Sequence, residues 1–260
     1  MDEPHPYPPS RLVVLALVAF GGGLLLAILI SGSIVAVQGW RLDVSAAAGA
    51  EAGRTAMQFA QGLPLDDLRP PGFALALLNL PLWVGLIGVP LLDRRNGLDW
   101  RRDLGWTMQP VDVPLGLAVG VATQFVLIPL YELVWLVFER QDVGQVADDL
   151  VAHVDGPLDV VAFIAMTVVM APLAEEIVYR GLLYRGIRNM EASHHSRAVG
   201  LAVVASSLVF AISHFQFVQF PGLFVFGVVA ALLFQRTGRL ATAIWAHVGF
   251  NATTVVLLLA

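Results

Sequence analysis

Six ionisable or amide side chains lie inside three of the most hydrophobic stretches of the chain. An ionisable group in hydrocarbon costs about 2.5–3.5 kcal/mol on insertion scales, so it is usually kept for a function. The segments are APLAEEIVYRGLLYRG, FAISHFQF and WAHVGFN, and the side chains are Glu175, Glu176, Arg180, His214, His247 and Asn251.

Carboxylate, imidazole and amide groups in one partly dehydrated pocket suit the hydrolysis of a carbonyl compound by water. A glutamate can take a proton from water as a general base, and an imidazole can orient that water. A His N–H and an Asn amide can hold the oxyanion that forms. The chain has no Cys, and no Ser is placed as a paired nucleophile. A directly attacking water is therefore the simplest chemistry.

Helical spacing indicates which of these groups share a face, because residues four apart on a helix are neighbours. Glu175 lies about 100° around the helix from Glu176. We therefore assign Glu176 to an ion pair with Arg180 and leave Glu175 free for chemistry, although the reverse division stays open. The expected neighbours are Glu176 with Arg180, Phe210 with His214, and His247 with Asn251.

The composition indicates a membrane protein. Of 260 residues, 57% are hydrophobic and 13% charged, and the mean hydropathy is +0.75. Soluble domains average about 45–50% apolar and about 25% charged residues. These values exclude a disordered chain, a nucleic-acid-binding module and an ordinary cytosolic enzyme. We predict an all-α polytopic membrane helix bundle, 1–260 as one integral-membrane domain, with the motif-bearing core at 158–255.

Seven apolar stretches approach the roughly 20 residues that a spanning helix needs. The first lacks the cleavage site of a signal peptide, so we expect it to remain as an anchor. An Ala-rich piece, Ser45 to Gln61, is expected to lie along the outer surface. The stretches are Leu12 to Val37, Phe73 to Leu92, Val113 to Phe138, one from Leu158, Ala198 to Phe215, Pro221 to Phe234, and Leu240 to Ala260.

Arginines cluster in alternate loops, as the positive-inside rule requires. The loop between the third and fourth stretches is acidic, which fits the outer side. We therefore expect a cytoplasmic N-terminus, an external C-terminus and a site that faces the cytoplasm, with Arg180, Arg185 and Arg188 at headgroup depth. The clusters are Arg94, Arg95, Arg101 and Arg102; Arg180, Arg185, Arg188 and Arg197; and Arg236 and Arg239.

Glu175 and His214 can share one depth only if the fourth and fifth stretches form a long antiparallel hairpin. Its expected turn is the polar run from Glu191 to Ser196. Measured from His194, Glu175 lies 19 residues back and His214 lies 20 residues on. Both then stand roughly 28–30 Å from the tip, and His247 can reach the same level from its own helix.

The three motifs together resemble a known family. EEIVYR is similar to the E-E-x-x-x-R motif of the CPBP family of intramembrane endopeptidases, which includes type II CAAX prenyl proteases and bacteriocin-processing, Abi-like relatives. FAISH is similar to the family's F-x-x-x-H motif, and HVGFN to its H-x-x-x-N motif. The motifs occur in the family's order over roughly residues 158–255.

The resemblance implies roles for these residues. Glu175 with His214 would activate a water, His247 and Asn251 would stabilise the oxyanion, and Glu176, Arg180 and Phe210 would support them. The substrate would be a membrane-delivered protein or peptide, cut near its C-terminus from a cavity open to the cytosol. The expected partners are that substrate and the lipid bilayer, and no nucleic acid.

Two questions stay open from the sequence. Zinc could be held by Glu175, His214 and His247, but H-E-x-x-H and any histidine pair at i,i+4 are missing, so we favour a reaction without metal or other cofactor. The other open question is function, for which the alternatives are a non-catalytic membrane scaffold or immunity protein, and a small ion- or proton-coupled transporter.

Overall fold

The computed structural model describes residues 7–38, 72–136, 156–190 and 195–259, and within these ranges the regular secondary structure is helical throughout. Six helices are long and apolar enough to cross a membrane, and a seventh, shorter apolar helix covers Ser196–Ile212. The predicted polytopic helical bundle is therefore confirmed. The expected surface helix from Ser45 to Gln61 and the acidic loop lie outside the described residues.

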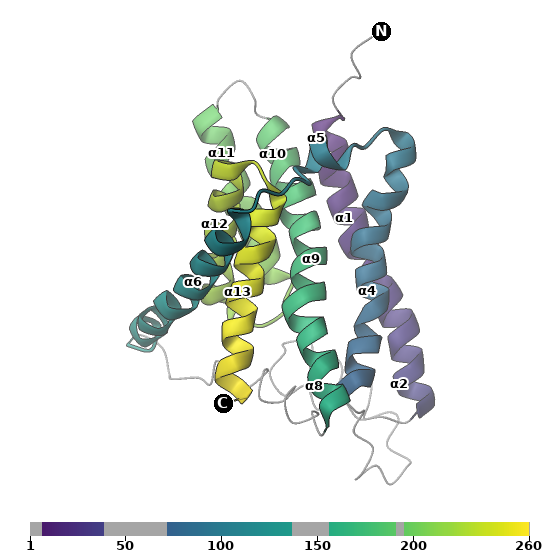
Figure 1. The fold of residues 1–260 in the computed structure, drawn as a ribbon. Helices are drawn as coiled ribbons and strands as arrows, with labels where there is room; N and C mark the ends of the chain where they lie inside the picture. The colour runs from purple at the N-terminus through teal and green to yellow at the C-terminus, as the bar shows by residue number, and fades with distance from the viewer. Residues whose placement is uncertain (1–6, 39–71, 137–155, 191–194, 260) are drawn as a thin grey trace.

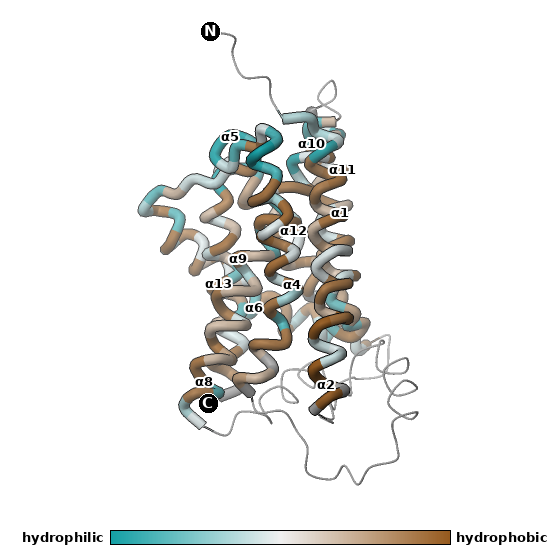
Figure 2. Tube along the Cα trace, turned by 90° about the vertical axis from the view of Figure 1, so that its right-hand side faces the viewer, coloured by the Kyte–Doolittle hydropathy of each residue, from teal (hydrophilic) through white to brown (hydrophobic). Residues whose placement is uncertain are grey.

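The helices run up and down the bundle in chain order. α1 begins at one end and α13 finishes at the opposite end (Figure 1). Hydrophilic residues gather at the end that carries α5 and α10, while the flanks are mainly hydrophobic (Figure 2). Outside the fourth span, the helices are α1 (Pro9–Leu26), η1 (Ala27–Ser31), α2 (Gly32–Gln38), α4 (Gly72–Leu92), η2 (Asp93–Asn96), α5 (Trp100–Leu104), α6 (Asp112–Val134), α11 (His195–Ile212), α12 (Phe220–Thr237) and α13 (Leu240–Leu259).

The fourth span is a single run of helix over Pro157–Met190, 34 residues long. At 1.5 Å per residue it measures about 51 Å, well beyond a hydrocarbon core of about 30 Å. Two of its turns are π-helical, and π-helical turns are frequent at functional sites. The second follows directly after the paired glutamates. The parts are α8 (Pro157–Ile164), η3 (Ala165–Met170), α9 (Ala171–Glu176), η4 (Ile177–Tyr184) and α10 (Arg185–Met190).

α11 packs against α10 and η4, which forms the expected antiparallel hairpin. The expected polar turn lies mostly at 191–194, outside the described residues. α11 ends at Ile212, so it is shorter than the fourth span beside it. His214 follows directly after this early end, which places it deep in the bundle.

α13 packs along α6 through small residues. A Cβ at Gly120 would collide with the carbonyl oxygen of Ala246 and would lie 2.7 Å from the backbone N of Phe250. At the start of both helices the buried Asp112 accepts hydrogen bonds from Arg239, with Nη2 at 2.7 Å from Oδ1. These contacts fix α13, which carries His247, against α6.

Candidate active site

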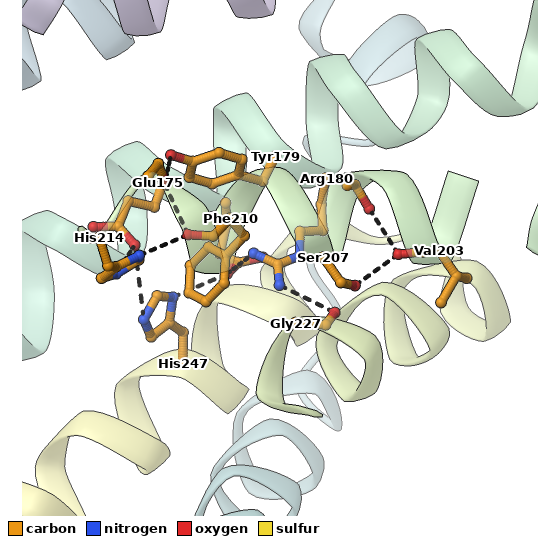
Figure 3. Close-up of polar contacts among 12 residues, drawn as sticks. Glu175, Tyr179, Arg180, Val203, Ser207, Phe210, His214, Gly227 and His247 are labelled. Atoms are coloured by element: carbon orange, nitrogen blue, oxygen red, sulfur yellow. Dashed lines mark hydrogen bonds and ion pairs between the residues drawn. The ribbon is translucent and has the colours of Figure 1, made fainter. Parts of the chain in front are cut away.

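Glu175 on α9, His214 in the turn after α11 and His247 on α13 meet inside the bundle (Figure 3). Oε2 of Glu175 lies 3.7 Å from Nε2 of His214 and 4.0 Å from Nε2 of His247. Glu175 and His214 therefore share one depth, as the hairpin predicts. Oε2 of Glu175 is buried and accepts no hydrogen bond from the described residues.

Glu176 joins its own helix to α13. Its Oε1 accepts a hydrogen bond from Nη1 of Arg180 at 2.7 Å and another from Nδ1 of His247 at 2.9 Å. The side chains of Glu176 and Arg180 are 0% and 1% exposed. The expected Glu176–Arg180 pair is thus present, fully enclosed by protein.

The guanidinium of Arg180 is held by α11 and α12. Nη2 donates to the carbonyl oxygen of Gly227 at 3.2 Å, and the guanidinium carbon lies 4.7 Å from the centre of the Phe210 ring. α12 also packs closely on α11 at this residue, because a Cβ at Gly227 would lie 2.9 Å from Cβ of Ser207. The charge of Arg180 is thus neutralised inside the bundle, and its expected headgroup depth stays a prediction.

The two glutamates differ in access. The side chain of Glu175 is 18% exposed and that of His214 is 24% exposed, whereas Glu176 is sealed at 0%. Only Glu175 of the pair can meet water or a substrate without a rearrangement. This geometry favours Glu175 as the reacting carboxylate and Glu176 as the partner of Arg180.

The hydrogen-bond partners of the two histidines indicate which ring nitrogens carry protons. Nδ1 of His214 lies 2.7 Å from the carbonyl oxygen of Phe210, which can only accept, so Nδ1 must donate. In the neutral ring Nε2 then carries a lone pair, and it faces Glu175. Nδ1 of His247 likewise faces the carboxylate of Glu176 and acts as a donor.

Sequence reasoning missed a second polar contact beside His214. The hydroxyl of the buried Tyr179 lies 2.6 Å from Oγ of Ser213, and Ser213 donates to the carbonyl oxygen of Phe210 at 2.8 Å. The carbonyl oxygen of Phe210 thus accepts hydrogen bonds from the side chains of both Ser213 and His214. Tyr179 lies four residues after Glu175, so helical spacing could have identified it.

Asn251 lies one helical turn beyond His247 on α13. Its Nδ2 donates to the carbonyl oxygen of Thr167 at 2.7 Å, which ties α13 to the fourth span. An amide nitrogen carries two hydrogens, so this bond leaves one of them for another acceptor. Sequence spacing indicated that Asn251 shares a helix face with His247, but it did not indicate the hydrogen bond to Thr167.

Within the described ranges, no group of three or more His, Cys, Asp and Glu side chains is arranged to hold a metal ion. The candidate zinc ligands Glu175, His214 and His247 do converge, with nitrogen–oxygen separations of 3.7 and 4.0 Å. The metal-independent reaction stays a prediction.

Comparison with known protein families shows which proteins the region around this site is similar to. Residues 157–253 match the family model of type II CAAX prenyl endopeptidase Rce1-like proteins. This region contains the whole fourth span and all three motifs, so the resemblance to the CPBP family is confirmed there. Over these residues the chain is similar to Rce1-like type II CAAX prenyl endopeptidases.

Individual relatives are more distant. The chain is 29% identical over 134 residues to the membrane-embedded CAAX protease MroQ of Staphylococcus aureus (strain USA300), covering 51% of this chain and 54% of the relative. It is 28% identical over 158 residues to an uncharacterized protein of Mycoplasma capricolum, covering 57% of this chain and 44% of the relative. The matched region therefore spans about half the length of these relatives. No solved structure matches the chain.

Proposed function

We propose that this protein is an intramembrane endopeptidase in which Glu175 and His214 activate a water molecule. The observation that supports this is the arrangement around Oε2 of Glu175, which faces two imidazole Nε2 atoms at 3.7 and 4.0 Å. These distances exceed a direct hydrogen bond, which is about 2.7–3.2 Å. We propose that a water molecule bridges the carboxylate and the imidazoles; the Glu175 side chain is 18% exposed, although Oε2 itself is covered.

The proposed reaction is a general-base hydrolysis. Glu175 takes one proton from the water as its oxygen attacks the peptide carbonyl carbon, while the lone pair on Nε2 of His214 accepts the other O–H and orients the attack. The tetrahedral intermediate then collapses, the C–N bond breaks, and the proton passes from Glu175 to the leaving nitrogen. The products are a carboxylic acid and an amine, and the acid then releases its proton to solvent.

His247 is proposed to hold the oxyanion through Nε2. Because Nδ1 already donates to Glu176, donation from Nε2 requires the doubly protonated imidazolium. Glu176 stabilises that cation directly. A donor held in place beside the Glu176 carboxylate suits an oxyanion site in a low-dielectric interior.

The substrate class follows from the family match and not from the geometry. A peptide bond near the C-terminus of a membrane-delivered protein is the proposed target, and the site is proposed to open toward the cytoplasm. The relative from Staphylococcus aureus is named as a membrane-embedded CAAX protease, which supports the same class.

The test is incubation of purified wild-type protein with candidate C-terminal peptides, with and without a chelator, beside Glu175→Gln. We expect cleavage that resists the chelator and falls by at least about 100-fold in Glu175→Gln, since a lost general base typically costs 10²–10⁴-fold. Glu132→Gln, at an exposed position on α6, makes the same charge change and is the control.

Other outcomes overturn particular parts of the proposal. Full activity in Glu175→Gln removes Glu175 from its role, and loss of wild-type cleavage with the chelator removes the metal-free mechanism. Peptide binding without cleavage across the panel supports the non-catalytic scaffold instead.

A further inference from the structure

A cationic cavity lies in the segment between α4 and α6, separate from the proposed active site. It has a volume of about 660 Å³. Three arginines and two tryptophans contribute to its wall, against one aspartate. The lining residues are Arg94, Gly97, Leu98, Asp99, Trp100, Arg101, Arg102 and Trp106.

The residues that form the cavity are held in place by burial, a hydrogen bond and a ring contact. Leu98 and Leu104 are buried, and the indole N–H of Trp100 donates to the carbonyl oxygen of Pro90 at 3.2 Å. Trp100 and Trp106 contact edge to face, with ring centres 5.3 Å apart. Indole rings are favoured at the boundary between hydrocarbon and water.

The same segment is fastened to distant parts of the bundle. Nη1 of Arg185 donates to the carbonyl oxygen of Arg102 at 2.7 Å. The backbone N–H of Leu240, at the start of α13, donates to the carbonyl oxygen of Gly105 at 2.8 Å. The arginines of this segment are therefore carried by a fixed backbone.

The charges of the cavity are unevenly compensated. Arg102 makes a two-pronged pair with Asp103, through Nε at 2.8 Å and Nη2 at 2.9 Å. Asp99 accepts from the backbone N–H of Arg102, which holds the pKa of Asp99 below its usual range and keeps it ionised. The exposed Arg94 and Arg101 have no side-chain hydrogen bond to the described residues, so the cavity has an excess of positive charge.

We propose that this cavity binds the phosphate of an anionic phospholipid headgroup. The guanidinium groups of Arg94 and Arg101, which make no side-chain hydrogen bond to the described residues, match a phosphodiester, which arginine can bind through paired N–H groups. The cavity lies directly after the span Ala76–Asn96, at the hydrophilic end of the bundle, where headgroups are expected (Figure 2). The exposed face of Trp106 would contact the glycerol and upper acyl region.

The test measures lipid binding to the full-length protein in detergent, by native mass spectrometry or by melting temperature, with phosphatidylglycerol and phosphatidylcholine. We expect preference for phosphatidylglycerol, and binding about fivefold weaker in Arg94→Gln and in Arg101→Gln. This corresponds to roughly 1 kcal/mol per positive charge at a membrane surface. Arg95→Gln is the matched control, because Arg95 is exposed beside Arg94 but does not line the cavity.

Three results contradict the proposal. Equal weakening in Arg95→Gln indicates a general surface attraction and no defined site. Equal binding of phosphatidylcholine shows that the anionic charge is not recognised. Stabilisation by inorganic phosphate alone, with the same dependence on Arg94, assigns the site to a soluble phosphate and overturns the lipid assignment.

Discussion

Two adjacent glutamates reach opposite environments because one residue of helical rotation separates them. Glu176 turns into the protein, where Arg180 and His247 satisfy one of its oxygens. Glu175 turns toward His214, and both side chains are partly exposed. An exchange of roles between the two would require a rotation of the fourth span, which Arg180 opposes through its bond to Gly227.

Asn251 provides the first prediction at this scale. If its amide holds the oxyanion, Asn251→Ala should lower kcat about 100–1000-fold, as for other lost oxyanion donors. The measurement is steady-state cleavage, with melting temperature recorded in parallel. A loss of stability alone, with kcat intact in the folded fraction, would limit Asn251 to its bond with Thr167.

The second prediction concerns Tyr179, and it rests on the proposed function. Its bond to Ser213 holds the end of α11 next to His214, so we expect Tyr179→Phe to lower kcat about five- to tenfold, the worth of one buried hydrogen bond. KM should stay nearly unchanged, and adding Ser213→Ala should cause little further loss. Tyr184→Phe, on the same helix, removes a hydrogen bond to Gln235 and serves as the control.

Local spacing could predict the pairs within one helix and could not predict contacts between helices. Glu176 with Arg180 and Phe210 with His214 follow from a separation of four residues. The bond from Asn251 to Thr167 depends on how two helices are rotated about their axes. The sequence shows no such rotation directly.

Among the elements, the π-helical segment η4 places Arg180 in the protein interior. A π turn holds more residues than an α turn, so the regular 3.6-residue period does not apply over Ile177–Tyr184. Every residue of this segment is buried, and Arg180 is among them. The spacing of the arginines in the sequence did not show that the Arg180 side chain is enclosed by protein.

The contact between α6 and α13 yields a prediction about element packing. Gly120→Ala forces the backbones of the two helices apart, so we expect a loss of about 1–3 kcal/mol in stability. Cleavage should fall as well, because Ala246, which the new Cβ meets, precedes His247. Melting temperature and kcat are the two measurements.

Gly200→Ala is the control for that substitution. A Cβ at Gly200 meets nothing within 4 Å, and alanine is the better helix former. We expect unchanged or higher stability and unchanged cleavage. Equal effects of the two substitutions would contradict the close-packing explanation.

The whole molecule has two ends of different character, which makes its orientation testable. The absence of Cys permits single-cysteine labelling without background. From the positive-inside rule we expect Ser196→Cys, at the arginine-rich end, to react with a membrane-impermeant maleimide only after cells are permeabilised. Val37→Cys, exposed at the end of α2, should react in intact cells. The reverse pattern would contradict the predicted orientation.

The number of spans and their order could be predicted because hydropathy depends on composition over long windows. The depth of α11 could also be inferred, since Glu175 and His214 had to meet. The compact fold of the segment between α4 and α6 could not, because its contacts with Arg185 and Leu240 join residues far apart in sequence.

The intrahelical bond between Glu176 and Arg180 also has a consequence for biosynthesis. These two charges are four residues apart, so they can neutralise each other as soon as their helix forms and before α11, α12 and α13 are made. His247 lies on α13, the last of the described helices to leave the ribosome. The proposed reaction centre is therefore assembled only when synthesis has passed α13, and a partly made chain would lack it.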